Sequence, residues 1–260
     1  MNTPKPTNKS IIKALDILEL FITSDELGVT EVANKLKLPK TTAFNLLNTL
    51  ENRGLVEQNP DNSKYRLGIK IFELGMRWST GRDIRTVAMR RMQQCADDLG
   101  EIVMLTILSG GQALIILRAD PPVPFLLVPR LGYNLPLHST ASGKVLLANT
   151  AKTMQDEIIR KSALERYTSS TITDPAKLKK GLQKIRTDGY ALDEGETFNG
   201  TICCAAPICD YSNAVIASVS VMTSADRFPG LKSAELVEHV KKLAEKISYD
   251  LGYQLAKPSA

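Results

Sequence analysis

The residues that follow Leu38 have the types and the spacing of a helix that contacts DNA. Six side chains between residues 40 and 48 are candidate DNA contacts: Lys40, Thr41, Thr42, Phe44, Asn45 and Asn48. An asparagine can make two hydrogen bonds to adenine, and an apolar group contacts the methyl group of thymine. The segment therefore predicts readout of base edges in a major groove, with Asn45 as an adenine contact.

Four basic residues flank this helix and are expected to meet phosphates. Lys35 and Lys37 precede it, and Lys64 and Arg66 belong to a predicted hairpin that follows it. Contacts from basic side chains to phosphates position a protein on the duplex without reading its sequence. The alternative is a protein-docking module, because winged helices also bind proteins and a polar third helix is then only solvated.

Hydrophobic periodicity predicts the elements that position these residues. Apolar residues at spacings of three and four indicate a helix from Ser10, with Ile11, Leu15, Leu18 and Ile22 in one stripe. The elements expected next are a helix with Thr30 as its N-cap, a turn over 37–39, a helix from Pro39 to a stop at Gly54, and strands over 55–58 and 64–67. This order is a winged helix-turn-helix.

A second group of small polar residues, His138-Ser139-Thr140-Ala141-Ser142-Gly143-Lys144, opens another predicted helix. Free N–H groups and hydroxyls at a helix N-terminus suit an anion such as a carboxylate. The alternative is ordinary capping by Thr140 or Ser142. A nucleotide-binding P-loop is excluded, because His138 stands where that motif requires a glycine.

An acidic run, Asp193-Glu194-Gly195-Glu196, precedes a segment with two adjacent cysteines. The acidic side chains are expected on a loop before a strand, where they either bond ligand hydroxyls or form a solvated turn. Cys203 is a candidate nucleophile with His138 as its base, although no third group of known position supports the pair. The alternative is a small buried side chain. Two histidines and this cysteine spacing do not match a zinc site.

The rest of the chain mixes strands and helices with hairpin connections. Strands are expected over 103–108, 113–118, 125–129, 203–209 and 215–223, and helices over 69–80, 84–99, 142–148, 154–160, 175–188 and 233–251. This pattern is typical of an α+β fold, an antiparallel sheet flanked by helices.

The composition of the 260 residues is that of a folded globular protein, with 43% hydrophobic and 23% charged side chains. No apolar run reaches the roughly 18 residues of a membrane helix, and the polar segment 1–10 lacks the apolar region of a secretory signal. Four cysteines form no disulfide framework, which fits a cytoplasmic protein. The net charge of +5 lies entirely in residues 1–91, which fits nucleic acid as a partner and fits a solvated charged face equally well.

The order of these segments resembles the IclR-type transcriptional regulators of bacteria and archaea, over about residues 9 to 253. The resemblance is carried by the opening helix 10–18, the recognition helix 39–50, Tyr65-Arg66-Leu67-Gly68 in the wing, the segment 137–148, and Glu196 with the segment 200–208. It implies a winged helix-turn-helix DNA-binding domain over 1–68, a linker helix over 69–85, and a GAF-like effector-binding and oligomerisation domain over 86–260.

The resemblance also implies partners and a pocket. Members of the family are dimers or tetramers that bind pseudo-palindromic operators in double-stranded DNA and respond to small organic or aromatic acids. The family's effector pocket and the adjoining helix start fall on Leu127, Leu135, Ser139, Thr140, Ala141, Ser142, Asp193, Cys203, Ser220 and Met222. No catalytic residue, metal or cofactor is implied.

Two residues depart from the family's pattern. Met222 stands where serine is frequent, which makes the pocket more apolar. Asn45 stands where many members carry arginine, which shifts the expected base from guanine to adenine.

The interpretation that follows is a ligand-responsive, sequence-specific DNA-binding regulator of metabolic genes, with repression favoured over activation. The helix over 69–80 and the segment 82–91 are expected to transmit effector binding to DNA affinity. Two alternatives stay open at this point. A thiol-dependent enzyme would use Cys203, and a constitutive architectural DNA binder would respond to no metabolite.

Overall fold

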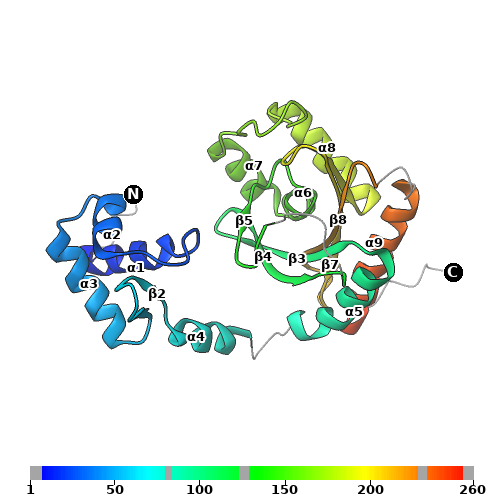
Figure 1. Ribbon diagram of the computed structural model, residues 1–260. Coiled ribbons are helices and arrows are strands. Elements are labelled where there is room, and N and C mark those ends of the chain that lie inside the picture. The colour runs from blue at the N-terminus through cyan, green and yellow to red at the C-terminus, as the bar shows by residue number, and fades with distance from the viewer. Residues whose placement is uncertain (1–7, 80–83, 123–128, 228–232, 254–260) are drawn as a thin grey trace. The chain divides into compact units, whose positions relative to one another are not determined.

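The computed structural model describes residues 8–79, 84–122, 129–227 and 233–253. The chain divides into two compact units, Met1–Asp83 and Ile84–Ala260 (Figure 1). In the described ranges, no helix combines the length and the apolar character that crossing a bilayer requires.

The first unit is a winged helix-turn-helix, as the sequence predicts. Its elements are α1 (Lys9–Leu20), α2 (Val29–Leu36), α3 (Lys40–Asn52), β1 (Val56–Gln58), β2 (Tyr65–Leu67) and α4 (Ile69–Ser79). The strands β1 and β2 form the antiparallel hairpin of the wing, and Leu27 adds a bridge to Tyr65. Gly54 ends α3 with a φ of 70°, a conformation that glycine adopts without steric cost.

The core of the first unit differs from the sequence pattern at α1. Ile17 and Phe21 are buried, whereas Ile11, Leu15 and Ile22 of the predicted stripe are exposed. This helix carries apolar residues on two faces, and periodicity alone does not tell which face packs.

The predicted N-cap of α2 is also wrong. Gly28 is the N-cap of this helix instead of Thr30. The Glu31 side chain reaches back to this cap and accepts a hydrogen bond from the Gly28 N–H at 2.7 Å.

The second unit is built on one antiparallel sheet. Its elements are α5 (Ile84–Leu99), β3 (Ile102–Ser109), β4 (Gln112–Ala119), β5 (Asn134–Leu135), α6 (Ala141–Ala148), α7 (Lys152–Lys161), α8 (Pro175–Asp188), β6 (Ala191–Glu194), β7 (Thr201–Cys209), β8 (Val215–Ser224) and α9 (Ser233–Asp250). The strand order is β5-β4-β3-β8-β7-β6. The strands β5 and β6 were not expected, and residues 125–128 of one expected strand lie outside the described residues.

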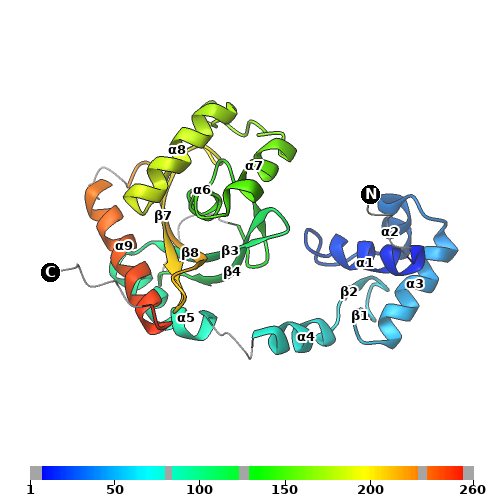
Figure 2. The same ribbon diagram turned by 180° about the vertical axis from the view of Figure 1, so that it is seen from behind.

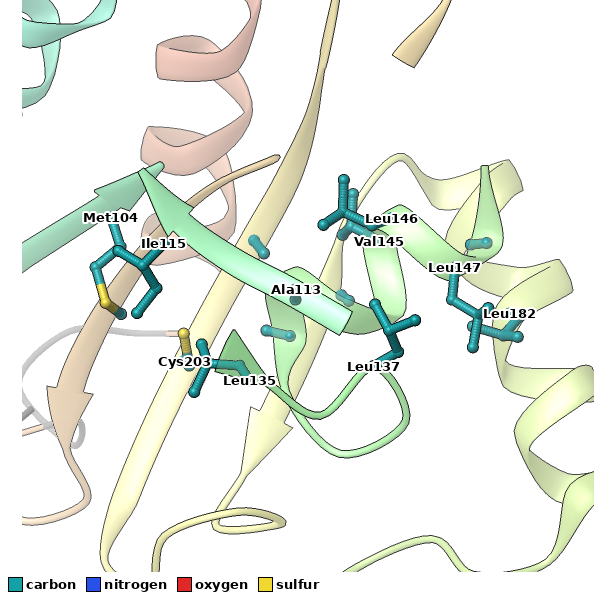
Figure 3. Close-up of a cluster of buried hydrophobic side chains, with 14 of the residues drawn as sticks. Met104, Ala113, Ile115, Leu135, Leu137, Val145, Leu146, Leu147, Leu182 and Cys203 are labelled. Atoms are coloured by element: carbon teal, nitrogen blue, oxygen red, sulfur yellow. The ribbon is translucent and has the colours of Figure 1, made fainter. Parts of the chain in front are cut away.

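Helices cover both faces of this sheet, so the α+β prediction is confirmed (Figure 2). Met92 of α5 and Leu236 of α9 belong to the core on one face. Val145 of α6 and Leu182 of α8 belong to the core on the other face (Figure 3). The face toward α6 carries the residues of the candidate effector site.

Candidate DNA-binding surface and effector site

The exposed face of α3 carries the predicted base contacts. Ala43, Leu47 and Leu50 point into the core, so a period of 3.6 residues turns the intervening positions outward. The exposed side chains include Lys40, Thr41, Phe44, Asn45 and Asn48, and Thr42 is half-buried. Phe44 is 49% exposed, although it is a large aromatic residue on a polar face. This surface has the chemistry to read base edges.

The turn between α2 and α3 places two lysines beside that surface. Lys35 and Lys37 are both exposed, and Lys37 caps α2 in the left-handed conformation with a φ of 53°. The next residue closes the turn, because the Leu38 N–H donates to the Ala33 carbonyl at 2.9 Å. Where the structure describes the chain, neither Lys35, Lys37 nor Lys40 takes part in an ion pair.

The wing differs from the turn, because its two cations are already paired. The Arg66 Nε donates to the Glu57 Oε1 at 2.7 Å across the hairpin. The Lys64 Nζ lies 3.4 Å from the Glu31 Oε2 on α2. A phosphate that meets either cation must compete with a carboxylate of the same chain.

Sheet register brings the predicted effector residues together on the α6 side. Asp193 pairs with Cys203, and Cys203 pairs with Met222, so three neighbouring strands present them in one row. Ser220 pairs with Ala205 in the adjacent row of the same face. All of these side chains are buried, as are Leu135 and Ala141. Figure 3 shows Cys203 and Leu135 in this core. Leu127 lies outside the described residues.

The start of α6 is held by its own cap. The Thr140 hydroxyl accepts from the Gly143 N–H at 3.1 Å and donates to the Pro136 carbonyl at 2.7 Å. Glycine is needed at 143, since a Cβ there would lie 2.6 Å from the Leu137 Cα. The N–H groups of Ala141 and Ser142, the first two of the helix, have no acceptor within it. The sequence predicts an anion site at this end of the helix.

The acidic run is not a solvated turn on a loop, as one interpretation of the sequence had it. Asp193 lies in strand β6 and is only 4% exposed. Burial raises the pKa of Asp193 to about 6, although the N–H groups of Glu196 and Thr197 and the Lys144 ammonium favour its charged form. The Glu196 N–H donates to Asp193 Oδ1 at 2.6 Å. The carboxyl group can accept a hydrogen bond from a ligand hydroxyl group.

A buried ion pair beside Asp193 was missed from the sequence. The Lys144 Nζ donates to the Glu196 carboxylate and, at 2.7 Å, to the Leu192 carbonyl. Both side chains are almost fully buried. The available signal was a single lysine in the otherwise uncharged helix 141–148. This pair connects α6 to the segment that holds Asp193.

A further hydrogen bond connects the same two segments. The Thr197 hydroxyl donates to the Ser139 hydroxyl at 2.9 Å. The start of α6 and the end of β6 therefore form one hydrogen-bonded site.

Cys203 lacks the features of a nucleophile. Burial raises the pKa of its thiol well above the ordinary range, and the Asp193 carboxylate adds to this effect. The Nε2 of His138, its proposed base, is bonded to the Glu165 carbonyl at 2.9 Å. Among the residues that the structure describes, no group of three or more His, Cys, Asp or Glu side chains has the arrangement of a metal site.

Two family models match the chain and together span most of it. Residues 10–60 match the IclR helix-turn-helix domain, and residues 76–249 match the bacterial transcriptional regulator IclR C-terminal domain. The chain belongs to the IclR family. It is therefore a DNA-binding transcriptional regulator with a C-terminal effector-binding domain, as the resemblance in the sequence predicts.

Individual relatives cover nearly the whole chain. The HTH-type transcriptional regulator XynR of Escherichia coli K12 is 32% identical, over 95% of this chain and 99% of its own length. The regulator KdgR of the same organism is also 32% identical, over 94% of this chain and 93% of its own length. Both are named as regulators.

Solved structures of IclR proteins are also similar to this chain over most of its length. IclR of Thermotoga maritima matches with a TM-score of 0.74 at 32% identity, over 94% of this chain and 99% of that one. An IclR homolog from Microbacterium hydrocarbonoxydans, in complex with 4-hydroxybenzoate, matches with a TM-score of 0.84 at 25% identity, over 94% of this chain and 99% of that one.

Proposed function

We propose that this IclR-family regulator is a ligand-responsive repressor in the cytoplasm, which controls metabolic genes in response to a small organic acid. The observation that carries the proposal is the buried polar site between the start of α6 and the strands β6, β7 and β8. A buried site with this many polar groups suits a small molecule that satisfies them.

The proposed effector carries a carboxylate and a hydroxyl group. The carboxylate would lie at the α6 N-terminus, against the N–H groups of Ala141 and Ser142. The hydroxyl group would donate to Asp193, whose carboxyl group is buried on the same sheet face as Ser220. Met222, Leu135 and Leu127 would contact the apolar part of the ligand. The relative in complex with 4-hydroxybenzoate binds a molecule with both groups.

On the DNA side, α3 is proposed to enter the major groove. Asn45 would bond adenine, Phe44 would contact a thymine methyl group, and Lys40 would meet a phosphate. Thr41, Thr42 and Asn48 complete the surface, and Lys35, Lys37, Lys64 and Arg66 are the further phosphate contacts. Selection of operators from a random duplex pool tests this assignment, because the enriched half-site should contain an adenine that depends on Asn45.

The protein is proposed to act as a homodimer or homotetramer on a pseudo-palindromic operator. Exposed Ile11 and Leu15 on α1 and Ile22 just after it give the first unit an apolar face that suits a second copy. The helix α4 and the segment 82–91 are proposed to carry the effector signal, with a typical coupling of about 1–3 kcal/mol, or 5–150-fold in operator affinity. Gly81→Pro should abolish the effector response while leaving ligand binding intact.

A thermal-shift screen against organic, aromatic and sugar acids tests the effector assignment. A ligand at a hundredfold excess over its Kd should raise the free energy of unfolding by about 2.7 kcal/mol. Asp193→Ala should weaken the binding of a hydroxy acid more than the binding of the matched acid without the hydroxyl group. If no acid of any class shifts the melting temperature, the acid-effector proposal fails.

The enzyme alternative is disfavoured on chemical grounds. A buried thiol with a raised pKa supplies little thiolate at neutral pH. Because the thiolate is the nucleophilic form of cysteine, Cys203 is a poor nucleophile. We propose instead that Cys203 lines the pocket as a small side chain. Cys203→Ser should then change effector affinity and leave operator affinity unchanged without effector.

A further inference from the structure

The geometry of the wing points to a second role for its acidic residues. We propose that Glu26, Glu31 and Glu57, here called the wing carboxylates, reduce the sequence-independent affinity of this protein for DNA. They would do so because each of the wing cations Lys64 and Arg66 must leave its carboxylate before it contacts a phosphate. This inference rests on the DNA-binding surface proposed above and extends it to residues that the pattern of base contacts does not include.

Two of the wing carboxylates pair directly with the cations. Glu57 lies opposite Arg66 in the hairpin register and accepts its Nε hydrogen at 2.7 Å. Glu31 lies on α2, with its Oε2 3.4 Å from the Lys64 Nζ. The same carboxylate oxygen accepts from the Gly28 N–H at 2.7 Å, so the capping box of α2 fixes its position. The ion pair of Lys64 therefore connects the wing to the helix-turn-helix.

The third carboxylate, Glu26, holds the tip of the wing. Its two oxygens accept from the Asn59 side-chain amide at 2.8 Å and from the Asn62 side-chain amide at 2.7 Å. These bonds lower the pKa of Glu26, and Arg66 and Lys64 add to this effect through their charges. The carboxylate is thus charged at neutral pH and senses both cations.

Two of the wing carboxylates therefore pair with the two cations, and the third acts on both cations through its charge. Lys35, Lys37 and Lys40 near α3 form no ion pair in the described part of the chain, as noted above. Binding to non-cognate DNA arises almost entirely from counterions that free cations release from phosphates. A cation that must exchange a carboxylate for a phosphate gains less from that exchange. The base-reading helix thus keeps its phosphate contacts, while the wing adds little sequence-independent affinity.

The test measures binding of the full-length protein to a labelled duplex of scrambled sequence at salt concentrations from 50 to 200 mM. The variants are Glu57→Gln and Glu31→Gln, since glutamine also serves in a capping box. Glu19→Gln is the matched control, because Glu19 is exposed on α1 and outside these pairs. Melting temperatures confirm that each variant is folded.

Each wing variant is expected to bind the scrambled duplex about two- to fivefold more tightly than the control variant, the range of an exposed ion pair. The slope of log affinity against log salt should become steeper by about one. Equal binding by the wing variants and Glu19→Gln would overturn the proposal.

A double variant tests whether Glu57 acts through Arg66. In Glu57→Gln/Arg66→Gln the gain should disappear, because no cation is left to release. A gain that persists would overturn the proposal, since the carboxylate would then act by repelling phosphates directly. Lys37→Gln distinguishes the inference from its foundation. If this variant binds DNA as tightly as the unaltered chain, the proposed DNA surface itself fails.

Discussion

The two units of this regulator use charge in opposite ways. The candidate DNA contacts of the first unit are exposed or half-buried side chains on α3, its flanking turn and the wing. The candidate effector contacts that the structure describes in the second unit are buried; they include a carboxyl group, and a buried ion pair lies beside it. The difference follows from their partners, because DNA is a large polyanion that must be reached from outside and a small effector molecule can be enclosed.

This difference sets the size of the effects that substitutions should have. Charges in water are screened, so an exposed pair contributes little and weakens with salt. A buried charge that loses its partner cannot be hydrated and destabilises the fold strongly. Four predictions test the comparison, from the largest expected effect to the smallest.

Removing the lysine of the buried pair should have the largest effect. Lys144→Met leaves Glu196 without its cation, and we expect a loss of about 3–5 kcal/mol in the free energy of unfolding. Denaturant unfolding, followed by a signal from the second unit, measures this loss. Lys179→Met, which breaks an exposed pair with Asp156, is the control and should be near neutral. A loss below about 1 kcal/mol for Lys144→Met would remove the contrast between the units.

The buried carboxyl group should make stability depend on pH. The pKa of Asp193 rises from 3.8 to about 6 on folding, so its contribution is fully favourable below pH 3.8 and is lost as the pH rises through 6. Asp193→Asn stays neutral and should be more stable than the unaltered chain at pH 7.5, by up to about 3 kcal/mol.

The advantage of Asp193→Asn should vanish near pH 4, where Asp193 is itself protonated. Urea midpoints at both pH values give the difference. Glu194→Gln is the control, because Glu194 is the exposed neighbour in the same strand. A pH-independent difference between Asp193→Asn and the unaltered chain would contradict the buried-carboxyl explanation.

Changing the base contact should alter sequence preference without altering stability. Asn45→Arg should shift the preferred base from adenine to guanine, and it should cost about 1–3 kcal/mol at the operator selected by the unaltered chain. Binding to duplexes with each base at that position measures the change. Asn52→Arg is the control, because it adds the same charge at the exposed end of α3. It should strengthen binding to all of these duplexes equally. An unchanged preference in Asn45→Arg would show that Asn45 does not face the bases.

Loss of the α6 cap should have the smallest effect on stability. Thr140→Ala removes the acceptor of the Gly143 N–H, and we expect a loss of about 1 kcal/mol. Thr140→Ser keeps the hydroxyl group and should be close to the unaltered chain in the same denaturant experiment. A larger loss in Thr140→Ser than in Thr140→Ala would contradict the role of this hydroxyl group.

Local signals in the sequence were sufficient for most elements. The helix α8 covers residues 175–188, as predicted, because Asp174 caps its start and Gly189 its end, and both act within a few positions of the helix ends. The winged helix-turn-helix was predicted for the same reason, since its turn, its helix stop and its hairpin are all encoded locally. The exposed face of α3 also follows from helical period alone.

Tertiary structure alone decided which of these patterns is buried and which charges meet. Ile11 and Ile17 are equally apolar, and only the packing of α1 against α2 and α3 leaves one exposed and buries the other. The pairing of Lys144 with Glu196, 52 residues apart, depends on how the end of β6 lies against α6. Asp193 is buried by the same arrangement, and a neighbouring glutamate is not. Periodicity and capping act over a few residues, whereas burial and long-range charge pairing arise only when distant segments come together.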